Sequence, residues 1–407
     1  MKKNTVLIIL AVLAAALFLF NPLKLLQNRS ATARRPTVER ALLDSLVRDA
    51  DSRFQTPADY IVRSFDGHDI VFLGEFYKIS QHVRLVSSLI PRLASAGVKN
   101  LGIEYALADS QKDIDALLGA PSWDENRARG ILMDWIPTWG YQEYIDILKA
   151  AWELNRVLPK GASPFRVVGL NVRQNWELLK TEKDARDPAT VRRILAHGIP
   201  DAYMAEVIQR EFTSRGAKAL VFCGVQHSFT RYRSREYEKQ AADMRLAEAR
   251  RTGNIVFDRI GGRAFTVMLH APWPDKTART GLAYAAGGAI DALIERLPPE
   301  RRNAGCDTAG TPLGGLPVTS PSYLTGYKSL ALSDLCDGYV ILGPLSDYRA
   351  VTPIADFVPA DRAEQAVRNF PGMKPPSLTL KDVNQAIVED AKAVDDALAP
   401  FRGGPAR

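Results

Sequence analysis

The chain is poor in the residues that build metal clusters and disulfide frameworks. Its 407 residues include three cysteines and five histidines, and neither a CxxC nor an HxxxH pair occurs. The usual spacing of a structural zinc site is therefore missing. The sequence also has no fixed-period repeat and no low-complexity tract, which excludes a repeat architecture.

A strong excess of charge of one sign is also missing. The net charge is +7, and the densest basic stretch, RYRSREYEKQ (231–240), is interleaved with Glu236 and Glu238. This pattern is typical of a solvated face, so no nucleic-acid partner is expected. Apolar residues make up 46% of the chain, as in an ordinary globular protein. The length fits one large α/β domain with extensions, or two domains.

An uncharged run is present at the N-terminus. Two lysines precede TVLIILAVLAAALFLF (5–20), which is short for a membrane span. We favour an uncleaved signal anchor over a cleaved signal peptide, because the nearest small-x-small site (31–33) lies about a dozen residues beyond the run. A buried N-terminal helix is the third interpretation. Either signal places the remaining chain outside the cytoplasm, anchored to the membrane, or secreted if the signal is cleaved.

Apolar runs alternate with amphipathic segments along the rest of the chain. The runs predict buried strands, and the segments between them predict helices. This alternation favours an α/β fold with a mostly parallel sheet and helices on both faces. Strands are predicted at 69–74, 100–105, 165–171, 218–224, 264–270 and 337–343, and helices at 38–50, 79–97, 107–157, 201–216 and 381–398.

The pattern divides the chain into three parts. Residues 1–37 hold the signal and a polar linker, and residues 38–297 form the α/β domain. Residues 298–407 form a loop-rich and helical extension that is expected to pack on the same domain. Within the domain, Asp201 is predicted to be an N-cap and Gly216 to end the same helix.

The three cysteines have different expected roles. Cys223 lies inside the apolar run ALVFCG and is expected to be a buried, unpaired thiol. Cys306 and Cys336 lie in a region rich in glycine and proline, and we expect them to be close enough to pair in an oxidising compartment. Such a bond would stabilise the fold by about 3 kcal/mol in the chain-entropy model. Spacing alone leaves the bond open.

Polar side chains recur where the predicted strands end. In open parallel sheets, ligands bind beyond the carboxyl ends of the strands. The polar residues at these ends are, in chain order, Glu75, Glu104, Asn171, Gln226 with His227, and His270. Their recurrence at one edge predicts a binding or catalytic site there.

The two glutamates have structural alternatives. Glu75 is either a site residue or a cap of the next helix, and Gly74 before it favours a sharp turn and a site role. Glu104 is either a site residue or the partner of an arginine such as Arg84. The position of His227 at the end of its strand favours a site role for this residue.

The other histidines are less informative. His82 lies on the apolar side of its helix, so it is either a site residue or a hydrogen-bonded core histidine. A structural role is favoured for His270. His68 and His197 are expected at the surface.

The order of these motifs resembles a known superfamily. A GE-x-x sequence before a histidine-bearing helix, a strand that ends in glutamate and a late G-x-x-H resemble the haem-binding ChaN proteins, TIKI/TraB-type proteases and erythromycin esterases. ChaN-type members are the most similar, through WGYQEYIDILKAAWELNR (139–156), VVGLN (167–171) and D-x-x-MA (201–205). The resemblance covers roughly residues 66–275, and its specificity comes from the order of short motifs.

The resemblance implies which residues form the site. In that superfamily the site consists of two glutamates and two G-x-x-H histidines, so Glu75, Glu104 and His227 carry over as catalytic residues or ligands of a divalent metal. Tyr77 stands where the first histidine belongs. A phenol with a pKa of about 10 is a poor base, but it can stabilise an oxyanion or bind ferric haem as tyrosinate. His82, further along the chain, is the candidate substitute, so Tyr77 and His82 are the predicted cofactor-binding residues.

Three functions remain open at this point. The first is a metal-assisted or Glu/His-dependent hydrolase of a small ester, amide or peptide outside the cytoplasm. The second is a haem- or metal-binding carrier at the membrane that performs no catalysis. The third is a scaffold with a vestigial site. The expected partners are a small-molecule or peptide ligand and, through the N-terminal run, the membrane.

Overall fold

A seven-stranded β-sheet organises the chain. The computed structural model describes residues 33, 36–278, 280–372 and 377–402. The strand order is β3-β2-β4-β1-β5-β9-β8, and every pairing is parallel except that of β8 with β9. The strands are β1 (Ile70–Glu75), β2 (Asn100–Leu107), β3 (Arg166–Asn171), β4 (Ala219–Gly224), β5 (Ala264–Leu269), β8 (Asn303–Asp307) and β9 (Gly338–Leu342), with a separate ribbon of β6 (Trp273–Pro274) and β7 (Leu282–Ala283).

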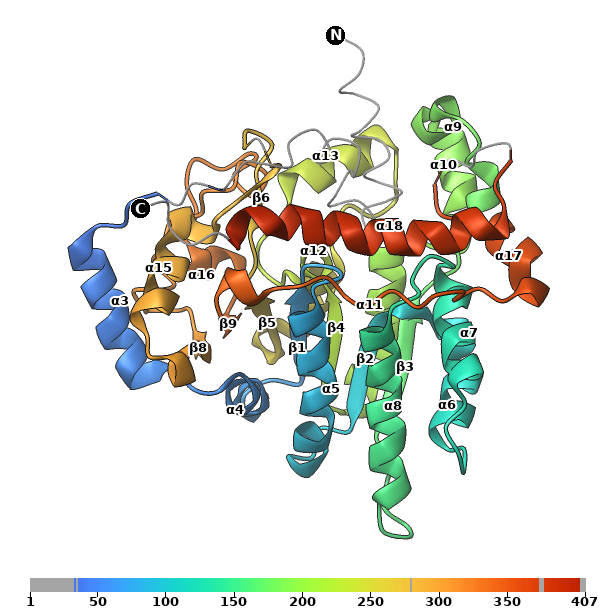
Figure 1. Cartoon of the computed structure of the whole chain (residues 1–407), viewed down its shortest axis with the longest axis horizontal. Coiled ribbons are helices and arrows are strands. Elements are labelled where there is room, and N and C mark those ends of the chain that lie inside the picture. The colour runs from blue at the N-terminus through green and yellow to red at the C-terminus, as the bar shows by residue number, and fades with distance from the viewer. Residues whose placement is uncertain (1–32, 34–35, 279, 373–376, 403–407) are drawn as a thin grey trace.

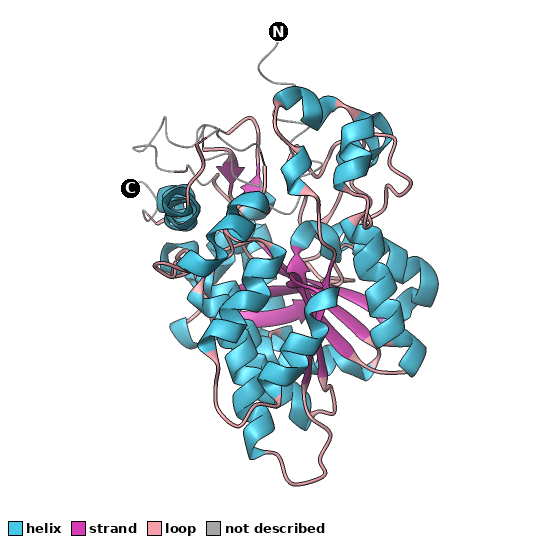
Figure 2. Ribbon diagram, turned by 90° about the vertical axis from the view of Figure 1, so that its right-hand side faces the viewer, coloured by secondary structure: helices cyan, strands magenta, loops and turns pink. Residues whose placement is uncertain are grey.

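Helices cover both faces of this sheet (Figure 2). Strand side chains alternate in direction, so Val71 and Leu73 join one apolar cluster while Ile70 and Phe72 join another. Helices α5 and α8 pack in the first cluster, and α11 and α14 pack in the second. The helices are α3 (Arg40–Arg53), α4 (Pro57–Arg63), α5 (Ser80–Ser95), α6 (Gln111–Leu118), α7 (Glu125–Trp135), α8 (Gln142–Val157), α9 (Glu182–Arg186), α10 (Pro188–Ile194), α11 (Pro200–Glu211), α12 (Val225–Ser228), α13 (Arg235–Asp243), α14 (Thr252–Ile260), α15 (Ala289–Arg296), α16 (Leu332–Leu335), α17 (Ala363–Arg368) and α18 (Leu380–Leu398).

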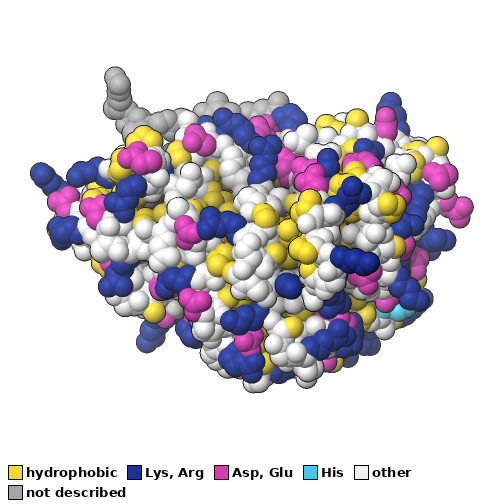
Figure 3. Space-filling view, turned by 90° about the horizontal axis from the view of Figure 1, so that it is seen from below, with side chains coloured by type: hydrophobic (Ala, Val, Ile, Leu, Met, Phe, Trp, Pro, Cys, Tyr) yellow, Lys and Arg dark blue, Asp and Glu magenta, His cyan; other side chains and the backbone are white. Residues whose placement is uncertain are grey.

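The long helix α18 crosses the carboxyl edge of the sheet, above α12 in Figure 1. Its Val383 and Ile387 belong to the cluster around α5 and α8, whereas Val394 and Leu398 belong to a further cluster beside β9. The helix therefore ties two parts of the core together by burying one apolar face along its whole length. On the opposite side of the molecule, seen from below in Figure 3, acidic and basic side chains are interspersed.

The α/β fold predicted from the sequence is confirmed. All six predicted strands are present, as β1, β2, β3, β4, β5 and β9. The predicted helical region 107–157 divides into α6, α7 and α8. The sequence did not predict β8, because NAGCD (303–307) is short and contains no apolar run. Its pairing with β9 places part of the 298–407 region inside the central sheet.

The predicted N-cap of α11 is wrong. The helix begins at Pro200 with Ile199 as its N-cap, and Asp201 lies in the first turn. Its carboxylate accepts hydrogen bonds from neighbouring segments instead of from its own helix. Gly216 is left-handed, with φ of 62°, and follows the 3-10 turn Thr213–Arg215, so it ends this helical segment as expected.

The predicted membrane segment, residues 5–20, lies outside the described residues. Among the described ranges, the structure contains no helix that is long and apolar enough to cross a membrane.

The cysteines are buried free thiols. This confirms the expectation for Cys223. Cys306 and Cys336 do not form the bond that was considered for them: Cys306 lies opposite Tyr339 in the β8–β9 ladder, and the Cys336 thiol instead donates to the Leu332 carbonyl of α16 at 3.7 Å.

Thiol counting tests this arrangement. Burial raises the pKa of Cys306 to about 12 and that of Cys336 well above its ordinary range. Because the thiolate is the reactive form, we expect slow labelling of the native protein by a chromogenic thiol reagent. Protein denatured without reductant should show all three thiols. A count of one would mean that Cys306 and Cys336 pair after all.

Candidate functional site

The buried polar groups at the carboxyl edge of the sheet form a hydrogen-bonded network. Glu75 ends β1, Glu104 lies near the end of β2, and His227 lies in the short helix α12 that follows β4. Tyr77 follows Glu75 by two residues. The side chains of these four residues are almost completely buried, and both glutamates are 0% exposed.

Glu104 occupies the point where β2 and β4 stop pairing. The two strands are in register only as far as Ile103 and Phe222. Beyond that point, the Gly224 N–H donates to Glu104 Oε2 at 2.8 Å, so a carboxylate replaces a backbone acceptor. The Tyr77 hydroxyl lies 2.8 and 2.9 Å from the two Glu104 oxygens. A Cβ at Gly224 would lie 2.1 Å from that hydroxyl, so only glycine leaves room for Tyr77.

His227 continues the network toward α11. Its Nε2 lies 3.4 Å from Glu104 Oε1, and its Nδ1 lies 2.6 Å from Asp201 Oδ1. Asp201 also accepts from the Thr252 N–H at 2.8 Å and from Arg251 at 3.0 Å. The Arg251 guanidinium lies over the Tyr237 ring, 3.4 Å from its centroid. Acidic and basic side chains therefore alternate along the network, in the order Glu104, His227, Asp201 and Arg251.

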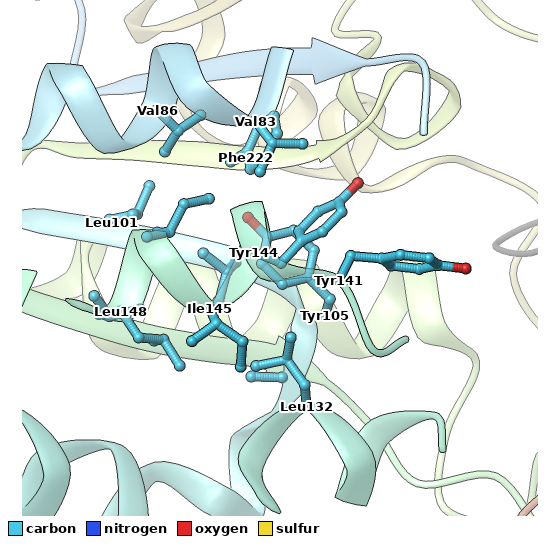
Figure 4. Close-up of a cluster of buried hydrophobic side chains, with 14 of the residues drawn as sticks. Val83, Val86, Leu101, Tyr105, Leu132, Tyr141, Tyr144, Ile145, Leu148 and Phe222 are labelled. Carbon is cyan, nitrogen blue, oxygen red and sulfur yellow. The ribbon is translucent and has the colours of Figure 1, made fainter. Parts of the chain in front are cut away.

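Glu75 has a separate partner on α8. The Tyr144 hydroxyl lies 2.8 and 3.1 Å from the two Glu75 oxygens, and the Lys78 N–H donates to the same hydroxyl at 3.2 Å. Figure 4 shows Tyr144 beside Tyr105 and Tyr141, within the aliphatic cluster that covers this face of the sheet. Two tyrosine–glutamate pairs therefore flank the end of β4, Tyr144 with Glu75 and Tyr77 with Glu104.

Burial and charge set the protonation of these groups. Burial in an apolar environment raises the pKa of Glu75 well above its ordinary value, against the Tyr144 hydrogen bond, and the charge of Glu104 raises it further. Burial acts to lower the pKa of His227, but the charges of Asp201 and Glu104 outweigh it, so the pKa is raised. Burial acts to raise the pKa of Asp201, but His227 and Arg251 lower it. These shifts favour the protonated forms of Glu75 and His227 and the anionic form of Asp201.

His82 is not brought into this network. Its Nδ1 accepts from the Phe76 N–H at 3.2 Å, and its Nε2 donates to the His270 carbonyl at 3.0 Å. Burial lowers the pKa of His82 to about 3, so the ring stays neutral. With both nitrogens bound to the backbone, His82 has the contacts of the hydrogen-bonded core histidine of the alternative interpretation, and its role as a substitute ligand stays a prediction.

The structural alternatives for the two glutamates do not hold. The N-cap of α5 is Ile79 and receives no side-chain hydrogen bond, so Glu75 does not cap that helix. Arg84 pairs with Glu143 at 3.3 Å rather than with Glu104.

Two other strand-end residues have local structural roles. His270 is bound by Tyr339 at 2.8 Å and lies 3.3 Å from Asp291, which agrees with its favoured structural role. Asn171 accepts a hydrogen bond from the adjacent Val172 N–H.

Sequence reasoning missed three members of the network: Tyr144, Asp201 and Arg251. Tyr144 lies inside WGYQEY, and Asp201 begins D-x-x-MA, so both were within motifs that carried the resemblance. Arg251 lies just before α14 and gave no signal, because its role depends on the packing of α14 against α11.

The donor set does not fit a metal ion or haem iron. The Glu75 oxygens accept from Tyr144, and both Glu104 oxygens already accept hydrogen bonds. In the part of the chain that the structure describes, no group of three or more His, Cys, Asp or Glu side chains is placed to hold a metal ion. The Tyr77 hydroxyl is directed at Glu104 and packed against Gly224, which leaves it no space to bind iron.

Solved structures share the fold. The chain is similar to a succinoglycan biosynthesis protein, with 10% identity, a TM-score of 0.50 and coverage of 78% of this chain and 99% of that chain. At this identity the likeness shows the fold alone. No protein-family model matches the chain, and no curated protein matches it.

Two other similar structures are of kinds that the sequence motifs resemble. One is the haem-binding ChaN of Campylobacter jejuni, with 13% identity, a TM-score of 0.36 and coverage of 56% of this chain and 91% of that chain. The other is a mutant of the erythromycin esterase EreC in its open conformation, with 12% identity, a TM-score of 0.43 and coverage of 76% and 96%.

The protonation of Glu75 has a measurable effect on stability. Its folded-state pKa lies well above the ordinary 4.5, so the folded protein holds a proton that the unfolded chain releases. Stability should fall as pH rises from about 4.5 toward the folded-state pKa, because the folded state binds more protons there. Glu75→Gln does not ionise and still accepts from Tyr144, so the variant should gain unfolding free energy relative to the wild type as pH rises above about 4.5.

Urea unfolding at several pH values measures this gain. The matched control is Glu153→Gln on the exposed side of α8, which should follow the wild-type pH trend. Identical pH trends in the two variants would show that Glu75 ionises freely in the folded protein.

Proposed function

We propose that the protein is a Glu/His-dependent hydrolase of a small ester, amide or peptide. The observation that carries the proposal is the set of buried carboxyl, phenol and imidazole groups that meet around the end of β4. Glu75, whose pKa is raised, lies near Glu104, and Glu104 lies 3.4 Å from His227, whose pKa is also raised. Environments that separate the protonation of neighbouring groups supply an acid and a base at the same pH.

Each residue has a role in this chemistry. Glu104 accepts a proton from water as the water oxygen adds to the substrate carbonyl carbon. The Tyr77 hydroxyl and His227 lie next to Glu104 and donate hydrogen bonds to the oxyanion that forms. Glu75 donates its proton to the departing alcohol or amine. The Glu104 proton then returns to solvent and Glu75 regains one, so the net reaction consumes one water.

Asp201 and Tyr144 act through other residues. Asp201 accepts from His227 Nδ1, which fixes the orientation of the ring and supports its positive charge. Tyr144 holds the Glu75 carboxyl in place. We place this activity outside the cytoplasm, on a protein held at the membrane by residues 5–20. Reporter fusions after residue 407 test the location, and activity of a cytoplasmic reporter alone would contradict it.

Glu104→Gln tests the hydrolase. Glutamine keeps an acceptor for Gly224 and Tyr77 but cannot take a proton, so kcat/KM on p-nitrophenyl esters or anilides should fall by about 10²–10⁴-fold. Glu153→Gln should retain the wild-type rate. Equal rates in Glu104→Gln and the wild type would contradict the proposed base.

The second candidate is a binding protein without catalysis. It is favoured by Tyr77, which replaces the histidine of the motif and fills the space between Glu104 and Gly224. The haem-binding ChaN among the similar structures gives the haem form of this alternative. The donor geometry described above weighs against the wild-type protein as a haem or metal carrier.

Tyr77→His tests the alternative. If the phenol replaced a ligand, the variant should retain stoichiometric manganese, zinc or cobalt after dialysis, whereas the wild type should not. Haemin added to the wild type should give no Soret band of a bound complex. A Soret band in the wild type would favour the carrier. Unchanged metal content in Tyr77→His, together with a silent Glu75→Ala, would leave the scaffold interpretation.

A further inference from the structure

A segment that follows β9 pairs with both stretches of chain that lead to the buried network. Residues 348–354, which we call the strap, pair with two loops. Arg349 O accepts from the Ser80 N–H, and the Val351 N–H donates to Lys78 O, both in the turn after β1. Thr352 O accepts from the Gln142 N–H, and the Ile354 N–H donates to Gly140 O, both at the start of α8. These four bonds, of 2.9 to 3.0 Å, join the segment after β1, which carries Tyr77, to the start of α8, the helix that carries Tyr144.

A buried glutamate holds the strap in place through hydrogen bonds. Glu143 is 2% exposed, and its carboxylate accepts from the Thr352 N–H at 2.8 Å and from the Ser80 hydroxyl at 2.8 Å. The Thr352 hydroxyl donates to the same carboxylate at 3.1 Å. One carboxylate therefore binds both the strap and the turn after β1.

Helix α18 contacts the strap and the turn after β1 through two carboxylates. Asp395 accepts from the Ala350 N–H of the strap at 3.4 Å, and Asp390 reaches Lys78. Lys78 is 4% exposed, and its ammonium forms an ion pair with Asp390 of α18. The Tyr141 hydroxyl donates to the same carboxylate at 3.2 Å. The ammonium also lies 4.7 Å from the centroid of the Trp139 ring. We call this set of Lys78, Asp390, Tyr141 and Trp139 the latch.

The latch is continuous with the proposed active site. The same Lys78 whose side chain reaches Asp390 donates its backbone N–H to Tyr144, and Tyr144 binds Glu75. Lys78 also has φ of 66°, in the left-handed region of backbone conformation that residues other than glycine rarely adopt. A strained residue at the junction of a cover and a site is held in place by its surroundings and relaxes when they are released.

We propose that the strap and α18 form an autoinhibitory cover over the network, closed by the Lys78–Asp390 latch. This inference rests on the proposed function, since it describes how a substrate reaches that site. With the cover closed, the four site side chains are inaccessible. Release of Asp390 loosens the contact of α18 with the turn after β1 while the apolar face of the helix stays buried. The strap then separates from that turn, which admits water and substrate beside Tyr77 and Tyr144.

Asp390→Asn in the full-length protein tests the latch, with Asp396→Asn as the matched control. Asp396 lies on the same helix and pairs with Lys392 at the surface, where both side chains are partly exposed. The readout is hydrogen exchange measured by mass spectrometry on peptides that cover 76–82, 138–144 and 348–356. The Lys78 amide donates to Tyr144, so its exchange reports the entry of water into the network without any substrate.

We expect Asp390→Asn to accelerate exchange in all three segments by about tenfold, while β3 keeps wild-type protection. In the same variant, kcat/KM on p-nitrophenyl esters should rise. Asp396→Asn should change neither. The cover is contradicted if the two variants exchange alike, or if Asp390→Asn accelerates exchange in β3 to the same degree, which would indicate general destabilisation.

The two proposals fail in different ways. If Asp390→Asn opens locally but no variant hydrolyses the esters, the hydrolase proposal is overturned and the cover proposal is retained. If hydrolysis depends on Glu104 but the Asp390→Asn variant does not open, the cover proposal is overturned and the hydrolase proposal is retained.

Discussion

The separation of β2 from β4 at their carboxyl ends is the constraint on which the site depends. If the two strands paired through Gly224, its N–H would bind a backbone carbonyl, and Glu104 would have no donor there. Because they separate after Ile103, the Glu104 carboxylate takes that donor and becomes available to Tyr77 and His227. The glycine at 224 is required by the same geometry, since a side chain there would displace the Tyr77 ring.

A buried network of this kind is stable only when its charges compensate one another. Removing an ion from water costs several kcal/mol in a protein interior, and a single unpaired charge is not tolerated. Here His227 lies between Glu104 and Asp201, and Arg251 pairs with Asp201. Burial raises the pKa of Glu75 and the charge of Glu104 raises it further, so the same environment favours the protonated form that the proposed reaction needs as its acid.

Much of the sheet could be predicted from the sequence, because each central strand is a continuous apolar run. The strand-end rule also identified Glu75, Glu104 and His227, since these residues follow such runs directly. Tyr144 and Arg251 could not be found in this way. They reach the site from helices, and their placement depends on how α8 and α14 pack on the sheet. β8 escaped detection because its pairing with β9 depends on a partner further along the chain.

The position of α18 in the chain has a consequence for biosynthesis. Every strand of the sheet precedes α18, so a ribosome delivers the sheet before the helix that covers it. Until α18 has been synthesised, the apolar side chains around α5, α8 and β9 that it covers lack this partner, so its docking adds the last apolar layer over that edge of the sheet.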